Sequence, residues 1–169
     1  MMKVKSIGDM KMFSLIKNDI RFIEIEKEIM NSNRDYNLIA YDKEALGTED
    51  ILDIFKDAEE LQIERYIVKK GEEYLAILDY GMSSPRYQKP WLSLLAMHKK
   101  YQGLGYAKKI YLTYEELMRM QKVNCIQIAV HSTNQQALTF WTSLGFIQFD
   151  ERIYEGKVIF SFEKKLGED

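Results

Sequence analysis

A short run of glycines and lysines could bind an anion through the backbone. Residues 98–110 read HKKYQGLGYAKKI and contain two of the chain's nine glycines, Gly103 and Gly105. The first amides of a helix have no partner within the helix, and glycine lets a ligand approach the backbone closely. The partial positive charge at the start of a helix then favours phosphate or pyrophosphate. Four lysines add to this charge: Lys99, Lys100, Lys108 and Lys109.

One other interpretation of this run stays open, and two are excluded. The glycines can instead make a tight strand-to-helix connection, with lysines that only solvate the surface. No GxxxxGK[ST] loop occurs in the chain. In GLGYAK the third glycine of a dinucleotide fingerprint is replaced by Lys108, and no acidic residue follows about 20 positions later. A P-loop and a dinucleotide fingerprint are therefore excluded.

Two segments resemble motifs of the GNAT superfamily of N-acetyltransferases. LAMHKKYQGLGYAKKI is similar to its acetyl-coenzyme A motif, Gln/Arg-x-x-Gly-x-Gly/Ala, at Gln102, Gly105 and Ala107. VHSTNQQALTFWTSLGF resembles a later motif at the following residues: Asn134, Ala137, Phe140, Trp141, Leu144, Gly145 and Phe146. The resemblance covers residues 62–165 and is weak over the first third of the chain.

The resemblance implies that acetyl-CoA binds in a sheet that splays open between the strands SLLAMH and IQIAVH. The pantetheine arm would follow the backbone of Ala96 and Met97, and the pyrophosphate would contact the amides from Gln102 to Ala107. The implied cofactor-binding residues are Ala96, Met97, Gln102, Gly103, Leu104, Gly105, Tyr106, Ala107, Asn134, Phe140 and Trp141. Several of these residue types would also suit a hydrophobic core, and Asn134 would suit a helix cap.

The implied reaction is direct attack of a primary amine on acetyl-CoA in a ternary complex. An alkyl amine of pKa ~10.4 is protonated at pH 7, so a side chain must accept its proton. The candidates are His98, His131, Asp79 and Glu73. His131 is named as a catalytic residue, and the choice of the base among the four stays open. The resemblance adds the Met97 amide as the donor to the oxyanion, and Trp141 at the leaving thiol.

Trp141 departs from the family's pattern. Many members have a tyrosine there that protonates the departing thiolate, whereas an indole N–H donates a hydrogen bond without acting as an acid. Tyr106, Tyr154 or Tyr80 could substitute. The departure leaves two alternatives to an enzyme: a CoA or acyl-CoA sensor with weak or no turnover, and an interaction module with an empty pocket.

Composition excludes several other classes. The chain has 24 basic and 26 acidic residues and a net charge of −2, without the basic excess of nucleic-acid-binding proteins. Its one cysteine, Cys125, cannot form an internal disulfide, and no run approaches 18 apolar residues. We expect a cytoplasmic protein that binds an amine substrate but no nucleic acid, membrane or metal. Its oligomeric state stays open, a homodimer included.

The expected fold is a single N-acetyltransferase domain of residues 1–169, in the α/β (α+β) class. It has a mixed, mostly antiparallel sheet of six or seven strands, splayed between the fourth and fifth and flanked by about four helices. Alternating residues predict a first strand at 2–7, and mixed spacings favour a helix over 8–30. Thr48 would cap the next helix, and either Ser132 or Thr133 would cap the last one. Strands are expected at 63–70, 73–80, 90–98 and 125–131, with a closing hairpin around Glu155–Gly156.

Overall fold

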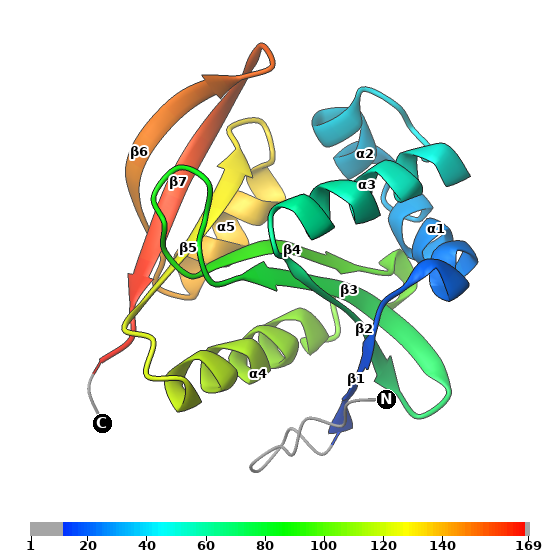
Figure 1. Ribbon diagram of the computed structural model, residues 1–169, viewed down its shortest axis with the longest axis horizontal. Helices are drawn as coiled ribbons and strands as arrows, with labels where there is room; N and C mark the ends of the chain where they lie inside the picture. The colour runs from blue at the N-terminus through cyan, green and yellow to red at the C-terminus, as the bar shows by residue number, and fades with distance from the viewer. Residues whose placement is uncertain (1–11, 168–169) are drawn as a thin grey trace.

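Seven strands form one twisted sheet in the part of the chain that the structure describes. The computed structural model describes residues 12–167, and the strand expected at 2–7 lies outside them. The sheet order is β1-β2-β3-β4-β5-β7-β6 (Figure 1). The strands are β1 Ser14–Lys17, β2 Glu64–Lys70, β3 Glu73–Gly81, β4 Trp91–Met97, β5 Cys125–His131, β6 Ile147–Tyr154 and β7 Lys157–Lys165. All neighbours are antiparallel except β4 and β5.

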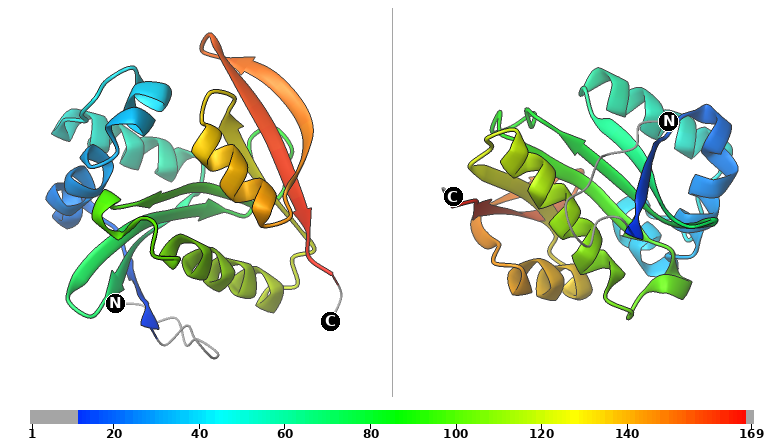
Figure 2. Two further views of the ribbon diagram at one scale, coloured as in Figure 1. Left: turned by 180° about the vertical axis from the view of Figure 1, so that it is seen from behind. Right: turned by 90° about the horizontal axis from the view of Figure 1, so that it is seen from below.

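Helices cover both faces of the sheet, as Figures 1 and 2 show from opposite sides. The helices α1 Ile23–Asn31, α2 Arg34–Tyr41 and α3 Thr48–Glu60 lie on one face, and α4 Tyr106–Met120 and α5 Gln135–Ser143 lie on the other. Two short 3-10 helices, η2 Ile20–Phe22 and η3 Lys99–Tyr101, precede α1 and follow β4. No helix within residues 12–167 is both long and apolar enough to span a bilayer.

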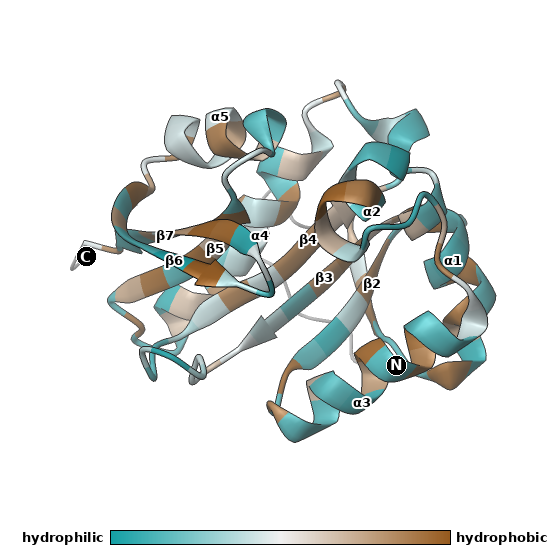
Figure 3. Cartoon of the chain, turned by 90° about the horizontal axis from the view of Figure 1, so that it is seen from above, coloured by the Kyte–Doolittle hydropathy of each residue, from teal (hydrophilic) through white to brown (hydrophobic). Residues whose placement is uncertain are grey.

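Each face of the sheet has its own hydrophobic core. Under α4 and α5, Tyr111, Tyr114 and Trp141 pack against strand residues. Under α1 and α3, Ile29 and Ile51 pack against another set of strand side chains. Figure 3 shows the corresponding pattern, with hydrophobic colour along the inner strands and hydrophilic colour over much of α1 and α3. The two cores fix the sheet between helices, which is what positions the ends of β4 and β5.

The expected splay between the fourth and fifth strands is confirmed. β4 and β5 are paired only at Trp91 and Gln127, where the Gln127 amide donates to Pro90 O at 3.0 Å. From there the strands diverge toward their carboxyl ends, Met97 and His131. The fold class and the closing hairpin are also as predicted, and five α-helices rather than about four flank the described sheet.

The expected helix over residues 8–30 is wrong in its middle. Ser14–Lys17 is the edge strand β1, where Leu15 is buried and pairs with Val68 of β2. The apolar residues of this segment fit both the spacing of a helix and the alternation of a strand, and pairing with β2 makes it a strand. The Asp19 side chain then accepts the Arg21 amide at 2.9 Å and begins the helical turn. Regular helix starts only at Ile23.

Two predicted helix caps also differ. The N-cap of α3 is Gly47, one residue before the predicted Thr48. The Gly47 amide donates to Asp50 Oδ2 at 2.8 Å, and Thr48 is the first residue of the helix. α5 is capped by Asn134 rather than Ser132 or Thr133, because Asn134 Oδ1 accepts the Ala137 amide at 3.1 Å.

Candidate active site

A cavity of about 420 Å³ opens where β4 and β5 diverge. Most of the residues expected to bind a cofactor line it: Ala96, Met97, Gln102, Gly103, Gly105, Tyr106, Ala107, Asn134, Phe140 and Trp141. Leu104 and His131 are not among the lining residues, and Leu104 is 61% exposed. The structure therefore brings the two sequence motifs together around one cavity.

The backbone amides at the start of α4 have no acceptor in the described protein. The first amide bonded within this helix is that of Lys109, which donates to Gly105 O at 3.4 Å. The preceding amides, from Gly103 to Lys108, donate to no group of residues 12–167. Successive free amides at a helix start, with the helix dipole behind them, form a binding site for an anion.

Gly103 and Gly105 are explained by backbone conformation and not by packing. Their φ angles are +78° and +81°, in the left-handed region that costs most other residues roughly 1–2 kcal/mol. A Cβ added at either position would meet nothing within 4 Å. The space above these glycines is therefore open to a ligand.

The end of β4 directs the polar groups of Met97 into the gap. The His98 amide donates to Leu75 O of β3 at 2.7 Å. Because bonded and non-bonded pairs alternate along an antiparallel ladder, Ala96 also bonds to β3, while Met97 does not. The amide and the carbonyl of Met97 therefore face the side where β5 has diverged.

The Met97 carbonyl is occupied by two side chains. Asn33 Nδ2 donates to it at 2.8 Å, and Gln102 Nε2 donates to it at 3.1 Å. Gln102 Nε2 also donates to Asn33 Oδ1 at 2.7 Å. These three residues join the α1–α2 turn, the end of β4 and the glycine loop.

Aromatic side chains form the wall of the cavity beside α5. Phe140 and Trp141 are in edge contact at 4.8 Å between ring centroids. Trp141 is 8% exposed and also contacts Tyr111 and Phe146 edge-on, at 5.6 Å and 5.4 Å. Trp141 is therefore both a core residue and a lining residue, and its ring is held by packing on several sides.

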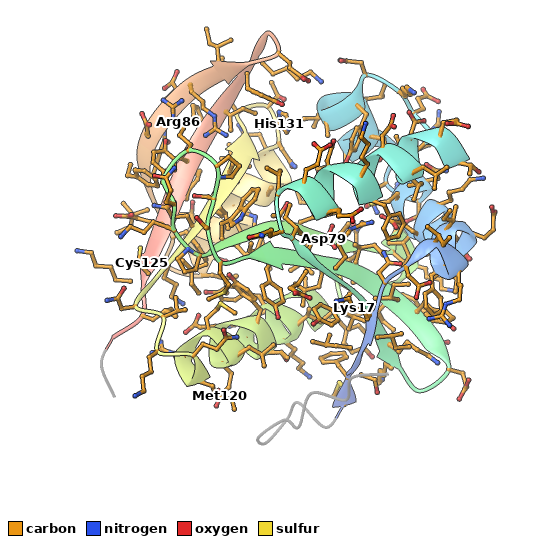
Figure 4. All side chains as sticks on the ribbon, in the orientation of Figure 1. Lys17, Asp79, Arg86, Met120, Cys125 and His131 are labelled. Carbon is orange, nitrogen blue, oxygen red and sulfur yellow. The ribbon has the colours of Figure 1, made fainter. Side chains whose placement is uncertain are left out.

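The two histidines occupy different environments. His131 is the last residue of β5, on the side of α2 (Figure 4). Burial and then the charge of Lys157 lower the pKa of His131, against a smaller opposing effect of Asp42. His98 Nδ1 instead accepts the Lys100 amide at 3.2 Å, and His98 Nε2 lies 3.6 Å from a carboxylate oxygen of Glu28. His98 is not among the residues that line the cavity, and its Nδ1 is hydrogen-bonded outside it.

Asp79 belongs to a buried charge cluster beneath α3 (Figure 4). Arg65 Nε donates to Asp79 Oδ2 at 3.0 Å, and the Arg65 guanidinium also pairs with Glu26 of α1. Asp79 Oδ1 is buried without a partner in the described residues. Burial raises the pKa of Asp79 to about 7, although the charge of Arg65 acts in the opposite direction. Glu73, the other acidic candidate, is exposed at the first position of β3.

The tyrosines proposed to replace the missing acid lie in three places. Tyr106 lines the cavity, and its hydroxyl accepts a hydrogen bond from Lys70 Nζ at 2.9 Å. Tyr80 is in the core under α4, stacked on Tyr66 at 5.9 Å, and Tyr154 is 58% exposed at the end of β6. Of these three, only Tyr106 reaches the cavity.

Sequence reasoning missed one wall of the cavity entirely. It comes from the α1–α2 turn and from α2: Ser32, Asn33, Arg34, Asp35, Tyr36 and Ile39. The run NSNRDYN is an ordinary polar turn by composition. Asn33 meets Met97 across 64 residues of sequence, and no local pattern predicts such a contact.

The comparisons identify the family. Residues 24–146, most of the chain, match the model of the acetyltransferase (GNAT) family. The chain therefore belongs to the GNAT acetyltransferases. A search of curated proteins finds no match.

Solved structures show the same fold at low sequence identity. An acetyltransferase from Thermus thermophilus superimposes with a TM-score of 0.75 at 18% identity, over 91% of this chain and 97% of that one. An acetyltransferase of Salmonella typhimurium that modifies the N-terminal serine of ribosomal protein L7/L12 gives 0.74 at 11% identity, over 92% and 96%. A spermidine N-acetyltransferase of Vibrio cholerae, in complex with CoA and spermine, gives 0.70 at 10% identity, over 92% and 96%.

Proposed function

We propose that the protein transfers an acetyl group from acetyl-CoA to a primary amine by direct attack in a ternary complex. The observation that carries the proposal is the run of free amides from Gly103 to Lys108 at the mouth of the β4–β5 gap, in a chain of this family. The alternation along β4 adds a free Met97 amide inside the gap.

The residues present fit acetyl-CoA. The amides of Gly103 to Lys108 would hold the pyrophosphate, and Lys99 and Lys108 line the same cavity with positive charge. The divergence of β4 from β5 leaves room and backbone groups for the pantetheine arm, beside Asn134 and the aromatic wall. When bound there, acetyl-CoA supplies the activated acetyl group as a thioester.

His131 is the proton acceptor in this proposal. An amine of pKa ~10.4 must lose a proton before attack, at a cost of roughly 4–5 kcal/mol at pH 7. The lowered pKa of His131 keeps its imidazole neutral at that pH and able to accept a proton. His131 does not line the cavity. Lys157 lies between them: its charge lowers the pKa of His131, and its Nζ donates to the carbonyl oxygen of Ile39, a lining residue, at 2.6 Å. The proton would therefore travel through water.

Met97 and Trp141 are the other two residues proposed to take part in the reaction. The Met97 amide points into the gap, where it would stabilise negative charge on the acetyl oxygen without any side chain. Trp141 would donate at most a hydrogen bond to the sulfur. A thiol of pKa ~8.5 leaves as thiolate at a cost of about 2 kcal/mol at pH 7, so the missing acid slows the step without preventing it.

Trp141 also favours a second candidate function, a CoA-binding sensor with weak or no turnover. Its ring is buried in the aromatic wall and cannot deliver a proton. Such a protein would bind CoA at the same amides but would not release thiol.

The acceptor is a primary amine of a small molecule, a peptide or a protein N-terminus. Two neighbours of the same fold act on such groups, one on spermidine and one on an N-terminal serine. The class of acceptor is therefore supported, and its identity must come from a screen.

Calorimetry with CoA and acetyl-CoA, combined with thiol release over a panel of amines, tests the proposal. Binding together with amine-dependent thiol release supports the enzyme. Binding without thiol release for any amine supports the sensor, and no binding of CoA contradicts both.

A further inference from the structure

We propose that Asn33 and Gln102 are positioning residues that hold the end of β4 through the Met97 carbonyl. We call this arrangement the Met97 clamp. The inference rests on the proposed function, since the clamp matters for turnover only if the Met97 amide acts on the acetyl group.

The splay of the sheet creates the need for a clamp. In a complete parallel pair, β5 would donate to the outward carbonyl at the end of β4. Here β5 pairs only at Trp91, so Met97 O has no strand neighbour although Met97 is 6% exposed. A buried carbonyl without a partner is costly, and the two side-chain amides supply the missing donors.

The clamp uses the hydrogen-bonding capacity of Asn33 fully. Asn33 Nδ2 donates to Met97 O at 2.8 Å and to Ile29 O at 2.9 Å, and it makes a longer contact with Ser32 Oγ at 3.3 Å. Its Oδ1 accepts from Gln102 Nε2 at 2.7 Å. The three shorter bonds reach three different elements: α1, the end of β4 and the glycine loop. The orientation of Asn33 is therefore fixed on every side.

Two donors saturate the Met97 carbonyl, because a carbonyl oxygen has two lone pairs. The pantetheine arm cannot then donate to Met97 O. The Met97 amide stays free for a ligand, and the next carbonyl that faces the gap is that of Leu95, two residues earlier on the same side of β4. The clamp thus selects which backbone groups the cofactor meets.

The clamp also joins two segments that line the cavity. Asn33 immediately precedes α2, whose Tyr36 and Ile39 are lining residues, and Gln102 immediately precedes Gly103. Figure 2 shows the chain after β4 beside α1 and α2. A shift of either segment would move the end of β4, and small displacements of a reacting group can cost up to ~100-fold in rate.

Four variants test the clamp. Asn33→Ala and Gln102→Ala each remove one donor, and their combination removes both. Gln102→Arg places Nε, with one N–H, at the chain position of Nε2 and adds the other guanidinium N–H groups just beyond it, so donors to Met97 O and Asn33 Oδ1 remain. Asn31→Ala is the matched control, because it truncates the same type of side chain two residues earlier. It removes three hydrogen bonds, to Leu46 O at 3.0 Å, from the Leu46 amide at 2.7 Å and from Asn37 Nδ2 at 3.3 Å, and Asn31 is not among the residues that line the cavity.

The readouts are thiol release, calorimetry with CoA, and hydrogen exchange of the His98 amide in the ligand-free protein. We expect kcat to fall at least about tenfold in Asn33→Ala and Gln102→Ala, with the CoA Kd within about threefold of wild type, since the amides that bind the pyrophosphate remain. The double variant should be no slower than the slower single variant, because the clamp acts as a unit. Gln102→Arg should recover most of kcat, and Asn31→Ala should stay within about twofold.

Hydrogen exchange keeps the test independent of turnover. The His98 amide bonds to β3, so loss of the clamp should speed its exchange in Asn33→Ala and Gln102→Ala more than in Asn31→Ala. If the wild type releases no thiol, the proposed function fails and exchange alone decides whether the clamp exists. Effects in the clamp variants that match those of Asn31→Ala, or that multiply fully in the double variant, would overturn the clamp.

Discussion

Among single side chains, Asp79 has the most unusual environment. It shares Arg65 with Glu26, and one of its oxygens is buried without a partner. The raised pKa, about 7 against an ordinary 3.8, means that the folded state binds a proton more readily than the unfolded chain does. The stability that Asp79 contributes is therefore greatest at low pH and is lost as the pH rises from about 4 to 7.

We predict that Asp79→Asn removes this pH dependence. The free energy of unfolding of the wild type, measured relative to Asp79→Asn by urea denaturation, should fall steadily between about pH 4 and pH 7. Glu73→Gln, an exposed position on the same strand, controls for the loss of one acidic group. A difference between wild type and Asp79→Asn that stays constant with pH would contradict the assignment.

His131 gives a second pH-dependent prediction. Lys157→Met removes a cation that lowers the pKa of His131 and leaves the opposing effect of Asp42, so this pKa should rise. The acidic limb of kcat/KM should then move to higher pH, because a protonated imidazole cannot accept the proton from the amine. Both shifts are measurable, by NMR titration and by rate profiles, and the chain has only two histidines to resolve.

Lys165→Met, at the opposite end of β7, is the matched control and should leave both quantities unchanged. A pKa of His131 that rises while the rate profile stays fixed would show that another group accepts the proton.

The residues of the two motifs that line the cavity could be named from sequence because their positions depend on local features: glycines before a helix, and an aromatic pair on the next one. The contacts of Asn33 and of the Asp79–Arg65–Glu26 cluster could not be predicted. Their contacts join segments 14 to 69 residues apart in the sequence. The residue type alone, an asparagine in a turn or a buried arginine, does not predict which distant residue it contacts.

Among the elements, the loop between β4 and α4 contains the free amides on which the proposed CoA binding depends. Gly105 and Gly156 offer a matched comparison, since their φ angles are +81° and +76° and an added Cβ at either meets nothing within 4 Å. Gly156 lies in the β6–β7 turn, between Tyr154 and Lys157. Alanine at either position carries a similar backbone strain, roughly 1–2 kcal/mol.

We predict that Gly105→Ala raises the Kd for CoA at least about tenfold, whereas Gly156→Ala changes it by less than about twofold. The physical reason is that a Cβ at residue 105 would occupy the approach to the free amides. Calorimetry measures the Kd, and thermal unfolding checks that the two variants lose similar stability. Equal affinities in the two variants would place the pyrophosphate elsewhere.

Periodicity predicted most elements from β2 onward, because those segments carry one spacing each and end at glycine, proline or cap residues. It failed for β1, where Phe13, Leu15 and Ile16 suit either a strand or a helix until β2 supplies a partner. The caps of α3 and α5 were misplaced by one or two residues, since neighbouring polar residues compete for the same role.

The whole molecule is organised around an interruption in its sheet. The hydrophobic core under α4 and α5 includes residues of β3, β4, β5 and β7, so one core packs against the strands on both sides of the gap. The glycine loop closes one end of this gap with free amides, and the α1–α2 segment lines it as well. The arrangement explains why the chain leaves backbone groups of a central strand without a strand partner.

A crystal structure of the protein with bound CoA tests the central claim most directly. We predict that the diphosphate accepts hydrogen bonds from amides between Gly103 and Lys108, with the pantetheine arm between β4 and β5. A diphosphate bound away from these amides, or a pantetheine arm outside the gap, would contradict the account.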